Sequence, residues 1–417
     1  MATLETFQTL AQLLLEHFDD VQDPRVDRTK LHPLKDLLTI ALCSTLAGGP
    51  TWEDMPLWAN AQGLDWLRES LGLELPNGIA HHDTFARTIC RIPTQELEPC
   101  LSQILSRFRQ DKESISIDGK VLKGSARARK DTSDEASVQK PLTLLNVWAN
   151  DSRIMLAQHS IPENTNEIGE MQAVLEKIEI SGCVVTADAA HCQKKTVETI
   201  RKKKADYLLT LKENQPKLHE AVSSVFSYAS EHPHLAIEQS EESSRAHGRQ
   251  EWRCCKVIAV GDWLLPDDPI FKDWKDICSI VCVERKRQWR EKGTKKVSHS
   301  QTFYISSCAP DASSLLKIVR GRWGIENRGH YVLDVIFGED RNRSGRDYGP
   351  ANLALLRRVC MNLVRVAPGA KGSLKGRIKQ AGWSHDILKQ FLSTPVPDSP
   401  LVSTKTENAE GNRASEI

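Results

Sequence analysis

The chain has 417 residues, 40% of them hydrophobic, which excludes a disordered or fibrous protein and allows a large buried core. Its 56 basic and 55 acidic residues nearly cancel, so any nucleic-acid surface must come from local clusters of charge. The 11 cysteines lack the paired spacing of metal sites, and no apolar run is long enough to cross a membrane. We therefore expect a cytoplasmic protein with reduced thiols and no membrane partner.

The first part of the chain carries the pattern of amphipathic helices. Apolar residues recur at helical spacing over residues 4–18 and 34–46, and Gly48-Gly49 ends the second run. Thr51 is followed by Asp54 at the spacing of a capping box, which predicts the start of another helix. These signals predict an all-helical N-terminal domain over residues 1–108.

Near residue 110 the apolar period changes from that of a helix to that of a strand. The predicted elements then follow the order β-β-β-α-β-α-β-α, which indicates a mixed α/β sheet. Strand-forming pieces dominate the stretch that follows, and helical spacing returns after it. The predicted parts are a core of residues 109–234 and 308–367, a β-rich insertion at 235–307, and a C-terminal extension at 368–417 with a disordered tail.

Three acids lie where chemistry is expected. The predicted strands Ile115–Asp118 and Cys183–Asp188 each end on an aspartate, and Glu326 lies in a predicted helix. Carboxylates that converge on one sheet edge repel each other unless a cation lies between them, and this suits divalent metals that act on phosphate esters. The structural alternatives are that Asp118 only forms a turn and that Asp188 only caps the next helix.

Polar residues near these acids are candidates for contact with DNA. Arg322 precedes Glu326 by four residues, so on a helix it would either reach a phosphate beside Glu326 or form an ordinary ion pair. His191 would orient DNA or a metal-bound water, or would only be packed. Lys212 and Asn214 follow a predicted strand end, where they would hold phosphate or simply begin a helix.

Basic residues form local clusters. The segment Glu284–Lys296 holds seven basic residues around Trp289, which suits phosphate contact with base stacking but also fits a solvated hairpin. A second cluster begins at Lys120, just after Asp118. Basic clusters beside the acids favour nucleic acid over a small molecule as the substrate.

The sequence resembles the DDE insertion-sequence transposases, and most closely their H-repeat-associated group. The resemblance covers most of residues 5–367, and His32-Pro33-Leu34 looks like the start of a helix in that group's N-terminal associated domain. Val319 and Leu333 depart from the wider pattern, which places Tyr and Lys there. The motifs that carry the resemblance are Ile117-Asp118-Gly119-Lys120, Ala187-Asp188-Ala189-Ala190-His191, Leu211-Lys212-Glu213-Asn214-Gln215 and Arg322-Trp323-Gly324-Ile325-Glu326-Asn327.

The resemblance implies a ribonuclease-H-like core in which Asp118, Asp188 and Glu326 are catalytic and hold two Mg²⁺ ions, with Mn²⁺ as a substitute. It also implies a β-rich insertion between the second and third acids. The residues expected to contact DNA are Arg322, His191, Lys212, Asn214, Lys120 and Trp289. The N-terminal domain would recognise DNA ends or make dimer contacts.

The implied activity is metal-dependent cleavage of double-stranded DNA at the terminal repeats of a mobile element, followed by joining to target DNA. Such a bacterial enzyme would work as a homodimer or larger synaptic complex and would lie on the nucleoid when bound to DNA. Two alternatives are a ribonuclease-H-like nuclease without strand transfer and an inactive, DNA-binding relic of a transposase.

Overall fold

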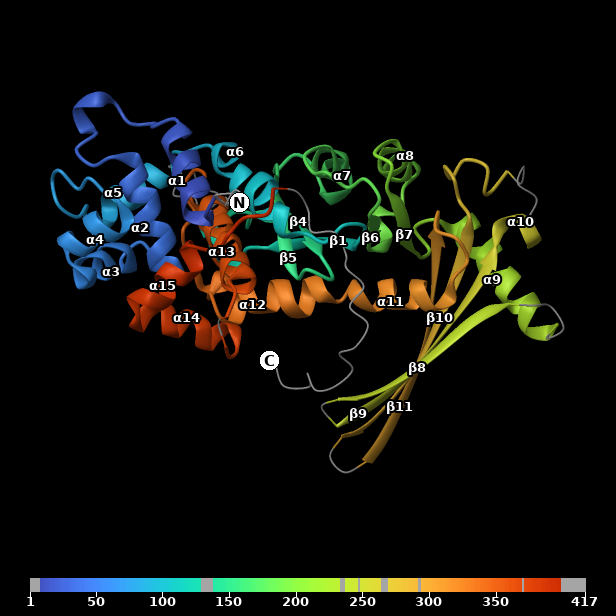
Figure 1. Ribbon diagram of the computed structural model, residues 1–417. Coiled ribbons are helices and arrows are strands. Elements are labelled where there is room, and N and C mark those ends of the chain that lie inside the picture. Colours follow the sequence, from blue (N-terminus) through green and yellow to red (C-terminus); the bar gives the residue numbers. More distant parts are fainter. Residues whose placement is uncertain are drawn as a thin grey trace, which may run out of the picture. The chain divides into compact units, whose positions relative to one another are not determined.

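The computed structural model describes residues 8–128, 138–232, 237–246, 248–263, 269–291, 294–369 and 371–398. The chain divides into two compact units (Figure 1). The first comprises residues 1–111, 119–164 and 326–417, and the second comprises residues 112–118 and 165–325. The chain leaves the second unit directly after Asp118 and again directly before Glu326. The tail predicted to be disordered begins near residue 393, but Thr394 and Val396 are buried, and Thr394 O accepts from Leu10 N at 2.9 Å, so the prediction is wrong for this first part. The remainder of the tail, beyond residue 398, lies outside the described residues.

The N-terminal part of the first unit contains helices, and several of them begin at recognisable caps. In the capping box at the first helix, Thr9 N donates to Gln12 Oε1 at 2.8 Å. Before the third helix, Thr51 Oγ1 donates to Asp54 Oδ2 at 2.7 Å. The elements are α1 (Leu10–Asp20), η1 (Asp27–Thr29), α2 (Leu34–Leu46), α3 (Asp54–Gln62), α4 (Leu64–Leu71), α5 (His82–Ile89), α6 (Thr94–Leu97), η2 (Cys100–Ile104) and η3 (Leu105–Phe108).

A long buried helix, α13 (Gly349–Val366), forms the core of the first unit. It packs against α2 and against β5 (Ile154–Ile161), which pairs antiparallel with β4 (Thr143–Ala149). The Asn362 side chain accepts from Met155 N at 2.9 Å and donates to Met155 O at 2.7 Å, so β5 is hydrogen-bonded to the helix. The other elements are β2 (Arg127–Ala128), β3 (Val138–Gln139), η4 (Lys123–Ser125), α12 (Tyr331–Val335), η7 (Glu339–Arg341), α14 (Leu374–Trp383) and α15 (His385–Leu392).

The second unit is built on a mixed sheet. Its parallel strands are β1 (Ser114–Val121), β6 (Val184–Ala187) and β7 (Asp206–Leu211), and the antiparallel strands β11, β10, β9 and β8 continue the sheet beyond β7. Within this unit the strand order is β1-β6-β7-β11-β10-β9-β8, and with the helices below it confirms a mixed α/β fold. The helices of this unit are α7 (Glu167–Glu176), η5 (Ala189–His191), α8 (Lys194–Lys202), α9 (Pro216–Glu231), α10 (Val260–Trp263) and α11 (Ala312–Gly321).

The segment predicted as a β-rich insertion forms a four-stranded extension of this sheet, which we call the arm. It consists of β8 (Glu238–Ala246), β9 (Arg249–Ala259), β10 (Ser279–Glu291) and β11 (Thr294–Ser306), and it projects from its unit (Figure 1). Near its base, Val257, Val281 and Tyr304 pack against Leu315 and Val319 of α11. We call this side of the sheet the α11 face.

None of the helices within the described residues combines the length and apolar character that crossing a membrane requires.

Candidate active site

The register of the parallel strands brings the two predicted aspartates side by side. The last paired residues of β1 and β6 are Ile117 and Ala187, and Asp118 and Asp188 are the next residue in each chain segment. Neighbouring strands lie about 4.8 Å apart, so the two carboxylates leave the sheet at the same edge. The neighbouring strands agree with the sequence pattern, but β1 continues past Asp118 to Val121, so the prediction that this strand ends at the aspartate is wrong.

Asp188 also caps the turn that follows it, which is the alternative role that the sequence suggested for this residue. Its Oδ1 accepts from Ala190 N at 3.1 Å, and its side chain remains 45% exposed. A carboxylate oriented by one backbone N–H and open to solvent keeps lone pairs for a cation. Capping and metal binding are therefore compatible at this residue.

His191 lies beneath Asp188 rather than on the surface. It is 1% exposed, and its Nε2 lies 3.9 Å from Asp188 Oδ1 and 3.7 Å from Glu167 Oε2. Neither ring nitrogen has a hydrogen-bond partner among the described residues. Buried polar atoms without partners are rare, so this imidazole suits a polar group bound beside Asp188 better than direct contact with a DNA backbone.

The loop after β7 supports the Asp188 turn. Asn214 Nδ2 donates to Ala189 O at 2.6 Å, and Gln215 Nε2 donates to Cys192 O at 3.0 Å. Lys212 is exposed on the same loop. Asn214 therefore positions the chain around Asp188, while Lys212 is placed where it can contact phosphate.

The helix predicted to carry both Arg322 and Glu326 is interrupted. α11 ends at Gly321, and Glu326 lies in one turn of π-helix, η6 (Ile325–His330). The expectation of one α-helical face for both residues is therefore wrong, because a π-turn changes the angular spacing of side chains. Arg322 Nη1 instead donates to Thr210 Oγ1 of β7 at 2.9 Å, a partner that the sequence did not reveal.

Glu326 has an imidazole neighbour, His330, whose tautomer is fixed by a buried network. Ligand atoms of the two residues lie within 4.8 Å of each other. Arg358 Nε donates to Asn146 Oδ1 at 2.8 Å, so the Asn146 amide group faces His330 Nε2, at 3.3 Å. Because an amide N–H₂ can only donate, His330 Nε2 must accept, and the ring proton is on Nδ1.

Burial makes protonation of His330 unfavourable. Burial, and then the positive charges of Arg358 and Lys120, lower the pKa of His330 to about 3. Arg358 itself is balanced by Glu339, whose Oε1 accepts from Arg358 Nη1 at 2.6 Å. His330 is therefore a neutral, oriented group beside Glu326.

Lys120, predicted to contact DNA, is buried within the first unit. Its Nζ donates to both carboxylate oxygens of Asp334 at 2.7 Å and lies 3.9 Å from Glu339 and from Asp340. An ammonium group held in this way organises the acids around it. Contact between Lys120 and DNA stays a prediction that this geometry does not favour.

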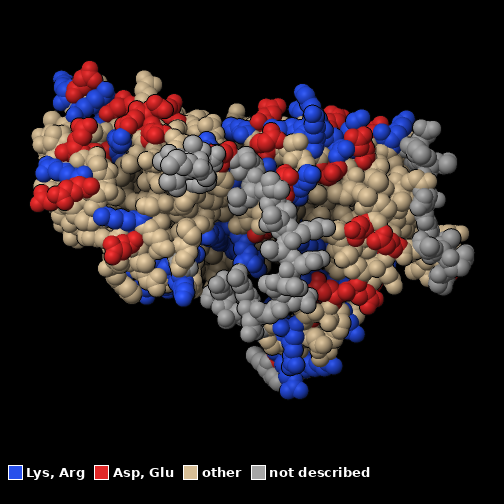
Figure 2. Space-filling view, viewed as in Figure 1, with Lys and Arg blue, Asp and Glu red and all other residues tan. Residues whose placement is uncertain are grey.

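Trp289 and the basic segment around it lie in the outer part of the arm. Trp289 is paired with Lys296 across β10 and β11 and is partly exposed. Lys and Arg side chains gather toward the far end of the arm (Figure 2). The predicted hairpin is therefore present, and it is basic.

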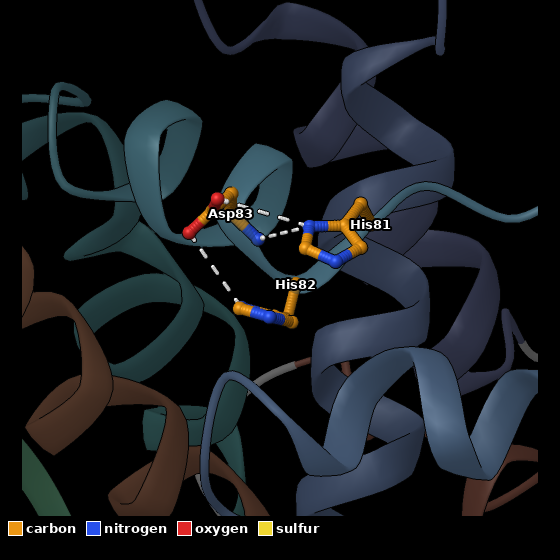
Figure 3. Close-up of side chains that lie close together, drawn as sticks. All are labelled: His81, His82 and Asp83. Carbon is orange, nitrogen blue, oxygen red and sulfur yellow. Dashed lines mark hydrogen bonds and ion pairs between the residues drawn. The ribbon is translucent and has the colours of Figure 1, made fainter.

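A second group with metal-binding side chains lies at the start of α5 and has a local explanation. His81, His82 and Asp83 are consecutive residues (Figure 3), and His81 Nδ1 accepts from Asp83 N at 3.4 Å as the helix cap. Asp83 also forms an ion pair with Arg87 at 3.5 Å. Adjacency in the chain and helix capping account for this cluster.

Comparison with known protein families identifies the class of protein. The family described as "Transposase DDE domain" matches residues 109–363, and the family described as "DDE_Tnp_1-associated" matches residues 15–105. The chain therefore belongs to the DDE transposases and is a DNA transposase.

Similar curated proteins place it in the H-repeat-associated group. The chain is 28% identical over 92% of its length to "Putative transposase YncI" of Escherichia coli O157:H7, covering 95% of that protein. It is 28% identical over 91% of its length to "H repeat-associated putative transposase YhhI" of Escherichia coli strain K12, covering 97% of that protein.

A solved structure is also similar over much of the chain. The piggyBac transposase in a synaptic complex with hairpin DNA gives a TM-score of 0.42 at 10% identity, covering 93% of this chain and 83% of that one.

Proposed function

We propose that this transposase cleaves DNA at the ends of an insertion sequence and joins the ends to target DNA, with Asp118, Asp188 and Glu326 as its catalytic, metal-binding acids. The observation that supports this most is the placement of Asp118 and Asp188 directly after the last paired residues of adjacent parallel strands. Carboxylates that leave neighbouring strands at one edge repel each other unless a cation lies between them. We further propose that the core is ribonuclease-H-like.

The residues present fit a hard divalent cation. The candidate donors are carboxylate oxygens, which Mg²⁺ prefers, and the orphaned ring nitrogens of His191 lie beside Asp188. Two Mg²⁺ ions, or Mn²⁺ in their place, would supply a Lewis acid that lowers the pKa of water and stabilises the leaving oxygen of an in-line displacement. Asp188 would act from a carboxylate already oriented by Ala190 N.

The chain's own residues would hold the DNA around these acids. Arg322 is oriented by Thr210, and Lys212 is exposed on the loop that follows the same strand. Arg contacts phosphate through paired N–H groups, and Lys contacts it as a point charge. The proposed substrate is double-stranded DNA carrying the terminal repeats, bound in a dimeric or larger complex together with the target DNA.

The test uses DNA that flanks the reading frame and carries candidate inverted repeats. Native protein should give nicked and covalently joined products with Mg²⁺ and none with EDTA. Asp188→Asn, which keeps an acceptor for Ala190 N, and Glu326→Gln should lose both products, whereas the control Glu198→Gln on the exposed face of α8 should keep them. Nicking without joining would identify a nuclease, and joining by either acid variant would contradict the triad.

A further inference from the structure

The arm has two chemically different faces because side chains alternate along its strands. At the base of the arm, the α11 face is apolar and packs on α11. Farther out, the same face carries Arg253 of β9, because it lies an even number of residues from Val257. It also carries Arg285 and Arg287 of β10, which lie an even number of residues from Val281 and Val283. Lys286 and Arg290, on the same strand β10, point to the opposite face.

The α11 face also carries the two candidate catalytic aspartates of this unit. Across neighbouring strands, Ser116 is paired with Thr186, Thr186 with Leu208, and Leu208 with Ser306. Asp118 and Asp188 lie two residues beyond the first pair, so alternation places both on the side of the sheet that packs on α11. One continuous face thus runs from the aspartates to the outer arm.

Like charges are brought together on this face. Arg253 lies directly opposite Arg285 across β9 and β10, a pairing that destabilises a sheet. Burial above all, with smaller contributions from Arg320 and Arg285, lowers the pKa of Arg253. An anion bound between these guanidinium groups would relieve the repulsion.

Acidic residues on this face offset only part of the positive charge. Glu242 pairs with Arg320 at the end of α11, and Glu251 pairs with both Arg253 and Arg287. These acids orient the guanidinium groups without matching them in number. On the outer α11 face the basic residues are Arg249, Arg253, Arg285, Arg287, Lys296 and Arg320, and the acidic residues are Glu242, Glu251 and Glu291.

The basic residues of the opposite face are already engaged near the middle of the arm. Lys256 Nζ lies 2.9 Å from Glu284 Oε1, and Lys286 Nζ lies 5.8 Å from the centre of the Trp252 ring. Arg290, paired with Lys295, lies at the far end of the hairpin. With Arg245 and Lys295 this face carries five basic residues, against the acids Glu241 and Glu284, so net charge does not separate the two faces of the arm. The α11 face differs in being continuous with the aspartates and in placing Arg253 directly opposite Arg285.

We propose that duplex DNA lies along the α11 face of the arm, with Arg253, Arg285 and Arg287 bound to its phosphates. The inference rests on the proposed function, since it takes double-stranded DNA as the substrate. Beyond Val283, which packs on α11, β10 continues from residue 284 to Glu291, and these eight residues at about 3.3 Å each extend over about 26 Å. One turn of DNA is about 34 Å long, so the outer arm can follow most of one turn of the backbone.

The test compares two double variants on the same strand. Arg285→Gln with Arg287→Gln removes two charges from the α11 face, and Lys286→Gln with Arg290→Gln removes two from the opposite face. Full-length proteins bind a fluorescent duplex of mixed sequence in EDTA over a range of salt concentrations. Thermal unfolding checks that both variants keep the native fold.

We expect the α11-face variant to bind more weakly at every salt concentration. The slope of log affinity against log salt should become shallower by about 2, since each lost phosphate contact removes about 0.9. The opposite-face variant should match the native slope and affinity. Equal losses in both variants, a larger loss in the opposite-face variant, or no loss in either would overturn the proposal.

This experiment is independent of catalysis because it is done without metal. If the α11-face variant binds weakly while native protein yields no metal-dependent products, DNA binding by the α11 face is supported and the proposed cleavage and joining are not. If native protein cleaves and joins DNA but the two variants bind alike, the chemistry stands and the surface assignment fails.

Discussion

His330 shows how residues far apart in the chain decide the state of a single side chain. Arg358 orients Asn146, and Asn146 then leaves His330 only the tautomer with its proton on Nδ1. An Nδ1–H group beside Glu326 can hold that carboxylate in one orientation. We expect this network to act by positioning Glu326, without touching DNA.

The ion pair that anchors the network can be tested by removing one partner. Arg358 and Glu339 are 0% and 1% exposed at their side chains, so Arg358→Met leaves a buried carboxylate whose nearest remaining cation is Lys120, at 3.9 Å. The free energy of unfolding should fall by about 3–5 kcal/mol, measured by urea denaturation. Adding Glu339→Gln should restore part of the loss; a double variant less stable than the single one would contradict the pairing.

Acid should destabilise the protein through His330. The pKa of His330 is lowered from 6.5 to about 3 by burial and by neighbouring cations, so between these values the unfolded chain binds a proton that the native state does not. The free energy of unfolding contributed by this group is complete above pH 6.5 and declines as the pH falls toward 3. In EDTA, His330→Asn should show a weaker dependence on pH over this range; an unchanged dependence would argue against a buried neutral imidazole.

At the scale of elements, helix α11 fixes the sheet face on which the proposed DNA surface lies. Its N-cap is Asp311, whose Oδ1 accepts from Ser314 N at 3.0 Å, and the hydrogen bonds from Ser314 lower the pKa of this carboxyl. Asp311→Ala should cost about 0.5–2 kcal/mol in the free energy of unfolding, and Asp311→Asn should cost less because it keeps the acceptor. Equal costs for both substitutions would show that the cap contributes little.

Local patterns predicted those elements whose signals are local. Strands that lead to Asp118 and Asp188 follow from short runs of apolar and β-branched residues, and the register of β1 with β6 shows that the strands are neighbours, although β1 continues past Asp118. The pattern over residues 235–307 indicates strands but not how far each extends, because the outer strands of the arm are polar on both faces and show no apolar alternation. The π-turn at Glu326 has no local signature and was read as ordinary helix.

Residues whose roles depend on distant partners could not be predicted. Lys120 meets Asp334 across 214 residues of sequence, so a basic residue next to an acid looked like a phosphate contact. Arg358 lies 212 residues from Asn146 and was hidden inside an apolar helical pattern. In both cases, burial of the charge in the folded unit decides its role.

At the scale of the whole molecule, the N-terminal helices share a core with the C-terminal part of the chain. Asn352 Nδ2 of α13 donates to Ile89 O and to Ile92 O at 2.8 Å, and Arg357 Nη2 donates to Pro50 O at 3.2 Å. α13 is buried along nearly its whole length. Recognition of DNA ends by the N-terminal part stays a prediction, but this part also stabilises the first unit.

Deletion of residues 1–108 should therefore unfold the first unit. Removing α2 exposes an apolar side of α13, and each large side chain returned to water costs about 1.5–3 kcal/mol. The measurement is hydrogen exchange of α13 backbone amides, which should lose protection in the truncated chain. Native protection of α13 in that chain would show that the N-terminal helices fold as an independent domain.

We propose that Asp118, Asp188 and Glu326 hold the same metal ions. The most direct measurement is Mn²⁺ binding by electron paramagnetic resonance, on native protein and on Asp118→Asn, Asp188→Asn, Glu326→Gln and the control Glu198→Gln. We predict that each triad variant loses affinity for Mn²⁺ at the shared site and that the control matches the native protein. Native affinity in any one of the three variants would remove that acid from the site and contradict the account.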